Sequence, residues 1–415
     1  MSIIKPQNLT ENSHQTLMDF LNFGGEISKE EIIHWIALWK LREKANVYLA
    51  KHLCVFKAFD EISTRTKMPA LTLLQAGEIY DSTHKFGGTI ITPRHWCYPQ
   101  QLKKIVDFPL ALHCFGRVEL LQNRIFAMVG SRSASTDALH ITQTFATELS
   151  KKGVTVISGF ANGIDTAACV GALQHGTIQV LGSGFECLYP KNNAELFKQV
   201  VANGGLFLSE FPTNTPAMPD HFPTRNRIIT GLSCGVLIGQ VNRKGGVSGT
   251  LVTLRIAISQ GKEIFAYPGN ILDERSKICN NLIKNGTAHF TTCVEDILEI
   301  IGDGKVRNIN LQADLFSAET SQKVAKNMEK FENITKKTHE SMERSQIANS
   351  IDAIDFQDST LELVYQSLST TPCGVSDIIV VTGLNASEVQ TALSELELMG
   401  KVLMNSVGKY SIALF

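Results

Sequence analysis

The sequence lacks several features that would assign it to a membrane-bound, secreted or metal-binding class. It contains no run of about 18 apolar residues, and no long apolar segment follows the opening Met-Ser-Ile-Ile-Lys-Pro, so we expect neither a membrane span nor a signal peptide. Its nine cysteines include no Cys-x-x-Cys pair and no neighbouring histidine cluster. We therefore expect no structural metal and a reducing compartment, the cytoplasm.

The chain also lacks a strong charge of either sign. Its net charge is −1, and 43% of its 415 residues are hydrophobic against 19% charged. This composition predicts a globular protein of two or three domains with a large core. Any contact with nucleic acid must then come from a local patch, since the overall charge supplies no attraction.

The glycine fingerprint of dinucleotide-binding proteins is missing too. Ile125–Val129 is typical of a buried strand, and a helix over Ala138–Leu149 is predicted after a glycine turn. Arg132 occupies the position of the second glycine in Gly-x-Gly-x-x-Gly, and no acid for a ribose follows about twenty residues on. The turn therefore indicates phosphate binding without NAD, and we expect no cofactor and no oxidoreductase.

Strands and helices alternate through the middle of the chain. Short apolar runs bounded by glycine favour strands covered on both faces, in a Rossmann-like, doubly wound parallel α/β sheet. The predicted strands are 125–129, 154–158, 178–181, 205–208, 236–238 and 263–266. The predicted helices between them are 138–149, 165–174, 194–201, 225–232 and 250–260.

Composition divides the chain into four parts. Residues 1–85 form a helical, SAM-like domain, with a helix-start signature at Ser28–Glu31 before helices over 32–41 and 45–54. Residues 86–302 form the Rossmann-like core, which begins with short strands and turns up to about residue 123. Residues 303–356 are a polar linker. Residues 357–415 form a winged-helix domain, with helices at 361–368, 376–382 and 387–399 and a hairpin over 401–412.

Four loops are predicted at the carboxyl ends of strands, where open α/β sheets bind ligands. Each combines glycines with donors that suit an anion at a helix N-terminus. Either each is a tight turn and nothing more, or together they line one binding crevice. Their candidate residues are Gly130, Ser131 and Arg132; Gly159 and Gly163; Gly182, Gly184, Phe185, Lys191 and Asn192; and Lys244, Ser248 and Gly249.

A fifth stretch, His221–Leu232, places Arg225 and Arg227 on either side of Asn226. Residues two apart on a helix point to different faces, so we expect one arginine to hold a phosphate and the other to fix the loop from inside. The alternative is a helix N-terminus with solvated arginines, which would oppose the helix dipole.

These motifs together resemble the bacterial DNA-processing protein A family (DprA, also called Smf) over about residues 86–300. The most specific is Phe222-Pro-x-Arg-Asn-Arg-Ile-Ile, supported by Val129-Gly-Ser-Arg132, Ser158-Gly-x-Ala-x-Gly-Ile-Asp165 and Tyr189-Pro190-x-Asn192. The resemblance implies a non-enzymatic, dimeric core that binds single-stranded DNA. It also implies delivery of incoming strands to the recombinase RecA during natural transformation in competent cells.

The resemblance implies roles for particular residues. Arg132 and Lys191 match basic positions that neutralise the DNA backbone, and such contacts carry no sequence information. Phe185 either stacks on a base or belongs to the core. Four positions depart from the family pattern: Asn162 for an arginine, Cys169 for a histidine, Gln240 for an acid, and His289 for an apolar residue in the dimer-contact segment.

One rival function and one rival role remain. Lys244–Thr250 resembles a loop of nucleotide phosphoribohydrolases of the lysine-decarboxylase-like family, but Thr253 occupies the position of the required glutamate, and no other catalytic set is evident. The winged helix is expected to contact protein more than DNA. Residues 357–415 hold two lysines and six acids, a net charge of −4, which repels phosphates.

Overall fold

The computed structural model describes residues 11–22, 27–68, 70–242 and 249–302, and scattered positions between 361 and 412. Contacts divide the chain into two compact units, residues 1–242 with 249–337, and residues 243–248 with 338–415. Among the residues described, none of the helices combines the length and the apolar character that crossing a bilayer requires.

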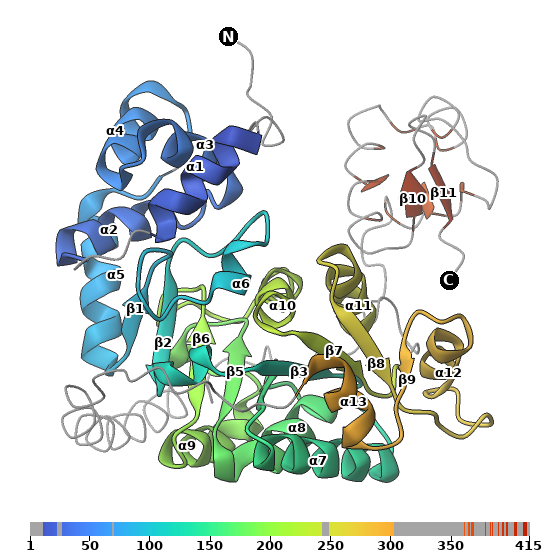
Figure 1. Ribbon diagram of the computed structural model, residues 1–415. Helices are drawn as coiled ribbons and strands as arrows, with labels where there is room; N and C mark the ends of the chain where they lie inside the picture. Colours follow the sequence, from blue (N-terminus) through green and yellow to red (C-terminus); the bar gives the residue numbers. More distant parts are fainter. Residues whose placement is uncertain are drawn as a thin grey trace, which may run out of the picture. The chain divides into compact units, whose positions relative to one another are not determined.

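A nine-stranded sheet organises the first unit (Figure 1). Its strand order is β1-β2-β6-β5-β4-β3-β7-β8-β9; β3 to β9 pair in parallel, and β1 and β2 add an antiparallel edge. The strands are β1 Thr89–Ile91, β2 Leu112–Gly116, β3 Ile125–Val129, β4 Thr155–Ser158, β5 Thr177–Leu181, β6 Leu206–Ser209, β7 Gly235–Ile238, β8 Glu263–Ala266 and β9 His289–Phe290. The predicted doubly wound α/β sheet is confirmed.

The chain order reverses at the centre of this sheet. From β3 it winds outward through β4, β5 and β6, whereas from β7 it winds the other way to β8 and β9. The neighbours β3 and β7 therefore form a topological switch point, where ligands bind in open α/β sheets. The loops after these two strands are the natural place for a site.

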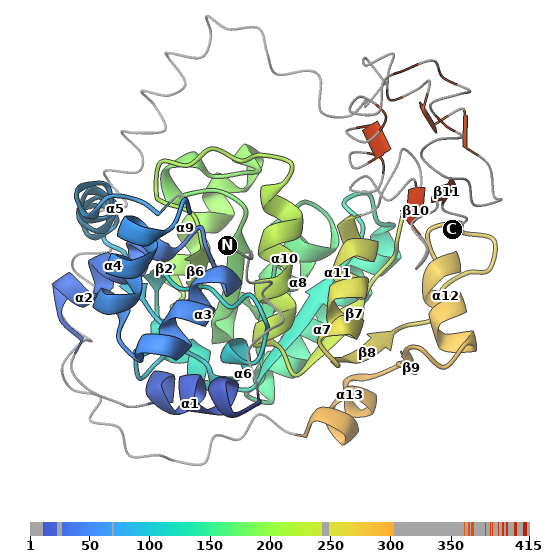
Figure 2. The same cartoon turned by 90° about the horizontal axis from the view of Figure 1, so that it is seen from above.

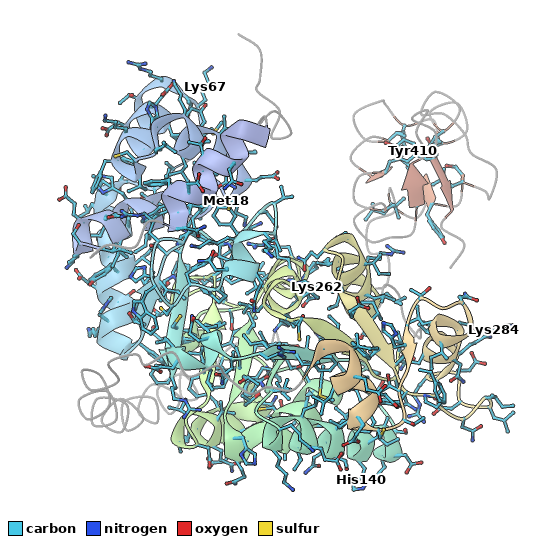
Figure 3. The ribbon with its side chains drawn as sticks, in the orientation of Figure 1. Met18, Lys67, His140, Lys262, Lys284 and Tyr410 are labelled. Atoms are coloured by element: carbon cyan, nitrogen blue, oxygen red, sulfur yellow. The ribbon has the colours of Figure 1, made fainter. Side chains whose placement is uncertain are left out.

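Helices cover both faces of the sheet, as Figures 1 and 2 show. One face is covered by α7 Thr136–Lys151, α8 Ile164–Ala172, α9 Ala194–Ala202 and α13 Val294–Ile301. The other carries α6 Gln100–Lys103, α10 His221–Leu232, α11 Gly249–Ser259 and α12 Lys277–Lys284. Every residue of β3, β4 and β5 is buried, which explains their continuous apolar runs. In Figure 3, His140 marks the α7 side and Lys262 the α10–α11 side.

Five helices precede the sheet: α1 Glu11–Asn22, α2 Lys29–Leu38, α3 Glu43–His52, α4 Val55–Arg65 and α5 Leu73–Phe86. The predicted start of α2 is confirmed, because the Ser28 side chain accepts the amide of Glu31 at 3.1 Å. Buried Trp35, Leu38 and Trp39 belong to the same hydrophobic cluster as the α10 side of the sheet. The helical part and the sheet thus share one core, while the boundary near residue 85 stays a prediction.

The second unit contains an antiparallel hairpin of β10 Val402–Met404 and β11 Tyr410–Ile412, which confirms the hairpin expected over 401–412. Its small core includes Val364, Leu393 and Leu396, all almost fully buried. Most of the three helices predicted here, and the linker 303–356, lie outside the described residues.

Candidate nucleic-acid interface

The turn after β3 carries the exposed side chain of Arg132. The backbone amide of Ser131 donates to the carbonyl of Gln240 at 2.7 Å, which joins the turn to the loop after β7. The Ser135 hydroxyl caps α7 by accepting the amide of Ala138 at 3.3 Å. Arg132 therefore lies at the switch point, ahead of the positive end of a sixteen-residue helix.

The loop after β4 packs against this turn and is hydrogen-bonded to it. The amide of Ile164 donates to the Ser131 carbonyl at 3.2 Å. Gly163 has φ of +79°, and a Cβ there would overlap that same carbonyl oxygen, so only glycine allows the close approach. Gly130 likewise packs directly on the Ile164 side chain. These two predicted site glycines shape the turn through their contacts with protein groups.

An aromatic pair lies beside Arg132. The guanidinium carbon of Arg132 is 5.7 Å from the ring centre of Phe222, which is 5.5 Å from the ring centre of Tyr189. Both rings are only partly buried. Gly182 makes room for Phe222, because a Cβ there would approach its Cδ1 to 2.9 Å. Two loops and the first turn of α10 thus bring a cation and two aromatic rings together.

Lys191 and Asn192 are exposed on the loop after β5, in the short 3₁₀ turn Lys191–Asn193. The Asn192 amide donates to Asn162 Oδ1 at 3.1 Å, so the asparagine at the family's usual arginine position links two rim loops. Asn193 anchors the turn by donating to the Phe160 carbonyl at 3.0 Å. Lys191 and Asn192 therefore face solvent on the same rim as Arg132.

Phe185 is the first correction. Its ring is fully buried and packs against Phe86 and Phe115, with ring centres 5.7 and 6.0 Å away. Of the two roles left open by the sequence, the structure supports the core phenylalanine. A fully enclosed ring presents no face to a nucleobase, whereas Phe222 presents part of its surface on the rim.

The arginines of α10 are the second correction, because both are buried and contact protein groups. Arg225 is 4% exposed and donates to the carbonyls of Gly159 and Val180. Burial lowers its pKa to about 10, so the group stays protonated at neutral pH. The carboxyl of Asp165 lies beside the same Gly159 and accepts its backbone amide at 3.2 Å. Burial raises the pKa of this carboxyl.

Arg227 is equally internal. Its Nη2 lies 2.5 Å from Glu210 and its Nε lies 3.1 Å from Asp107. Arg42, from the helical part, reaches the same Glu210 at 3.5 Å. Asn226, between the two arginines, is also buried and accepts from Arg225 Nε at 3.2 Å. The two arginines hold the surrounding loops together from inside, and Asn226 fixes the orientation of Arg225.

The remaining predicted positions divide into three groups. Gly159 and Gly184 are close-packing sites, since a Cβ at either would overlap a side chain or a carbonyl. Gly249 begins α11 and has open space around it. Lys244 and Ser248 lie outside the described residues, so their predicted role stays a prediction.

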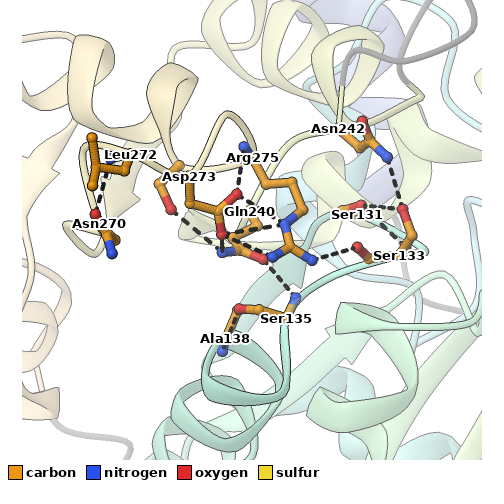
Figure 4. A network of polar contacts seen from close by, with 11 residues as sticks. Ser131, Ser133, Ser135, Ala138, Gln240, Asn242, Asn270, Leu272, Asp273 and Arg275 are labelled. Carbon is orange, nitrogen blue, oxygen red and sulfur yellow. Dashed lines mark hydrogen bonds and ion pairs between the residues drawn. The ribbon is translucent and has the colours of Figure 1, made fainter.

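The structure also gives the surroundings of three residues that depart from the family pattern: Cys169, His289 and Gln240. Cys169 is buried in the α8 core, where burial raises the pKa of its thiol. His289 lies on the edge strand β9 and contacts Glu263 at 2.7 Å. Gln240 joins a polar network across the switch point (Figure 4).

The described residues of the rim offer N–H donors and a partly exposed aromatic surface. Within the described ranges, no group of three or more His, Cys, Asp or Glu side chains could hold a metal. Sequence reasoning missed Phe222 and Tyr189 as rim aromatics, although both stand in the quoted motifs; only their packing beside Arg132 distinguishes them from Phe185.

Comparisons with known proteins agree with this geometry. A family model described as DNA recombination-mediator protein A matches residues 89–302, and one described as DprA winged helix domain matches residues 353–404. The DNA processing protein DprA of Streptococcus pneumoniae is 40% identical over 204 residues, 49% of this chain and 70% of that protein. Protein Smf of Escherichia coli is 42% identical over 204 residues, 49% of this chain and 54% of that protein.

A solved structure supports the fold. The X-ray structure of DNA processing protein A from Streptococcus pneumoniae superposes with a TM-score of 0.54 at 32% identity, covering 66% of this chain and 98% of that one. Sequence and fold thus point to the same relatives. The chain belongs to the DNA recombination-mediator protein A (DprA/Smf) family and carries the winged-helix domain of that family near its C-terminus.

Proposed function

We propose that this protein binds single-stranded DNA along the rim formed by the loops after β3, β4 and β5. The observation that carries the proposal is the Arg132 turn at the switch point, with Phe222 and Tyr189 beside it and Lys191 exposed on a loop of the same rim. Basic side chains and a helix N-terminus suit phosphates, and aromatic rings suit unpaired bases of any sequence.

The shape of the rim favours a single strand over a duplex. Its groups are short loops and half-buried rings, and among the described residues of this rim no helix projects in a way that would enter a major groove. Bases paired inside a duplex would not reach Phe222. We therefore expect binding without strong sequence preference.

A role without catalysis is part of this proposal. The rival hydrolase needs a carboxylate at position 253, and Thr253 is 3% exposed with its hydroxyl donating to the Gly249 carbonyl at 3.0 Å. A side chain held inside α11 in this way offers no acid to a glycosidic bond. DNA processing in this chain then consists of binding and delivery.

The family relationship supports three further parts of the proposal. We propose that the protein works in the cytoplasm as a homodimer formed through the Rossmann-like core, and that it protects incoming strands in natural transformation. We also propose that it hands those strands to the recombinase RecA. The four domains, 1–85, 86–302, 303–356 and 357–415, would supply support, DNA binding, a tether and a protein contact.

The test compares a fluorescent oligonucleotide as a single strand and as a blunt duplex, by anisotropy at several salt concentrations. We expect preference for the single strand and a slope of log affinity against log salt of about −0.7 per neutralised phosphate. Equal affinity for the blunt duplex would refute the proposal. Release of free base from nucleoside monophosphates would favour the hydrolase instead.

A further inference from the structure

Gln240, the second residue after β7, contacts both ends of the Arg132 turn. Its backbone carbonyl accepts the amide of Ser131, and its side-chain Oε1 accepts the amide of Ser135; both distances are 2.7 Å. The residue is only 5% exposed. Gln240 thus spans the turn that carries Arg132 and ends at the N-cap of α7 (Figure 4).

The other end of the Gln240 amide joins the loop between β8 and α12. Nε2 donates to Asp273 Oδ2 at 3.0 Å and to Ser276 Oγ at 3.3 Å. The backbone amide of Ser135 can only donate, so it fixes the orientation of the Gln240 amide without ambiguity. Gln240 must therefore accept on one side and donate on the other.

Asp273 is held as an anion by its own neighbour. The side chain of Arg275 donates to it from Nε and Nη2, at 2.9 and 3.0 Å, and the Arg275 backbone amide adds a third bond at 2.9 Å. These bonds, the side-chain ones first, lower the pKa of Asp273. The partner that Gln240 meets is thus an acceptor with no proton to give.

We propose that Gln240 is a positioning residue for the strand-binding turn, and that its neutral amide is matched to Asp273. The inference rests on the proposed single-strand binding by Arg132. A carboxylate at position 240 would still accept from Ser135, but it would face Asp273 as a second anion and could donate nothing. The turn would then lose its link to the β8–α12 loop.

The matched pair can be exchanged. In the double variant Gln240→Glu/Asp273→Asn, the glutamate accepts both from the Ser135 amide and from the side-chain amide introduced at position 273, so the donor simply moves to the other partner. The side-chain oxygen of that introduced asparagine can still accept from Arg275. If the second change, Asp273→Asn, restores the affinity that Gln240→Glu lowered, damage to packing alone cannot be the cause.

The charged groups around the Gln240 side chain also predict how the Gln240→Glu variant should respond to pH. Asp273 and Arg275 face it from the β8–α12 loop, while Ser131, Ser135 and Ser276 are neutral. Tyr267 lies near its backbone, and burial raises the pKa of that phenol to about 12, so it stays neutral. In Gln240→Glu alone, the glutamate beside Asp273 should be protonated readily on acidification, which restores a donor.

The experiment measures the affinity of the full chain for a labelled oligo(dT) strand and the hydrogen exchange of the Ser131 and Ser135 amides. We expect Gln240→Glu to bind about tenfold more weakly at pH 7.5 and the double variant to return to within about threefold of wild type. The deficit of the single variant should shrink at about pH 5. Gln143→Glu adds the same charge at an exposed site on α7 and should bind like wild type.

The results distinguish failure of the positioning role of Gln240 from failure of the proposed single-strand binding. Unchanged affinity and unchanged exchange in Gln240→Glu would overturn the positioning role, as would a double variant no better than the single one. If the wild-type protein does not bind oligo(dT), the proposed function fails. Exchange of the Ser131 and Ser135 amides still tests whether Gln240 holds the turn. Faster exchange at both amides in the single variant, reversed in the double variant, would support it.

Discussion

The guanidinium of Arg132 lies 5.7 Å from the ring centre of Phe222, although 90 residues separate them in the chain. Arg132 follows β3 and Phe222 lies in the first turn of α10, so the rim brings a cation that can bind phosphate next to an aromatic ring. A stacked cation also stabilises the ring's position, by about 0.5–1 kcal/mol at an exposed site. We infer that this pair forms the centre of the strand-binding surface.

Replacing Phe222 with alanine should weaken binding to a single strand. Base–aromatic stacking contributes about 1–3 kcal/mol per base, so we expect a loss of about 5-fold to 150-fold in anisotropy titrations. Phe222→Tyr keeps the ring and should bind nearly as wild type does. Phe185→Leu is the matched control: it should lower the melting temperature through its core position without changing the affinity of the folded protein.

Arg132→Ala and Lys191→Ala should each weaken binding to all sequences alike. Each change removes one phosphate contact, so the salt slope should become shallower by about 0.7. Both residues are exposed on the rim, and the melting temperature should therefore stay close to that of wild type. A collapse of thermal stability along with binding would show that these side chains support the fold instead.

Arg227→Met should destabilise the protein without involving the DNA surface. The change leaves Glu210, with 1% side-chain exposure, to Arg42 alone at 3.5 Å. Removing one partner of a buried pair costs about 3–5 kcal/mol, measurable as a shift in urea unfolding. The double variant Glu210→Gln/Arg227→Met should recover part of that loss, since it no longer buries an unpaired carboxylate. Equal stability of wild type and Arg227→Met would contradict the assignment.

The buried His113 and the half-buried His95 should make the fold sensitive to mild acid. Burial lowers the pKa of His95 to about 4 and that of His113 to about 3. His95 Nδ1 also accepts the Thr92 amide at 2.9 Å, a bond that protonation of this nitrogen would break. Unfolded histidines take up protons near pH 6.5, so stability is fully present above that pH and falls as pH drops toward 4.

The measurement is the free energy of unfolding in urea between pH 7.5 and 4.5. Wild type should lose stability with a slope approaching two protons, and His113→Gln should show a shallower slope. His140 is exposed on α7, so His140→Gln should leave the slope unchanged. A wild-type free energy that does not vary across this range would refute the prediction.

Deleting residues 357–415 should leave affinity for a single strand unchanged or slightly higher. The segment carries a net charge of −4 and covers most of the DprA winged helix match. A domain that contacts protein can be lost without loss of DNA, whereas any partner bound through it should no longer be captured. A truncated protein that is folded but binds about ten times more weakly, about 1.4 kcal/mol, would show that this domain holds DNA.

Sequence patterns predicted the sheet well and the first helices poorly. The strands β3 and β8 begin and end where the sequence predicted. Every residue of β3 is buried, and a strand buried on both faces needs a continuous apolar run; β8 differs only in beginning with the exposed Glu263. Residues 1–85 were expected to be helical, but the bounds of α1, α4 and α5 were not predicted. Their buried faces pack into a core shared with α10, so their patterns depend on neighbours distant in the chain.

The sequence by itself determined the fold class, the family motifs and the exposed basic candidates Arg132 and Lys191, because strand periodicity and glycine turns are local properties. Only the tertiary structure decided which residues of those motifs face solvent. It enclosed Phe185, Arg225 and Arg227 and left Phe222 on the rim. The physical reason is that burial of a side chain depends on what packs over it, and a buried arginine needs carbonyl or carboxylate partners that only the folded chain supplies.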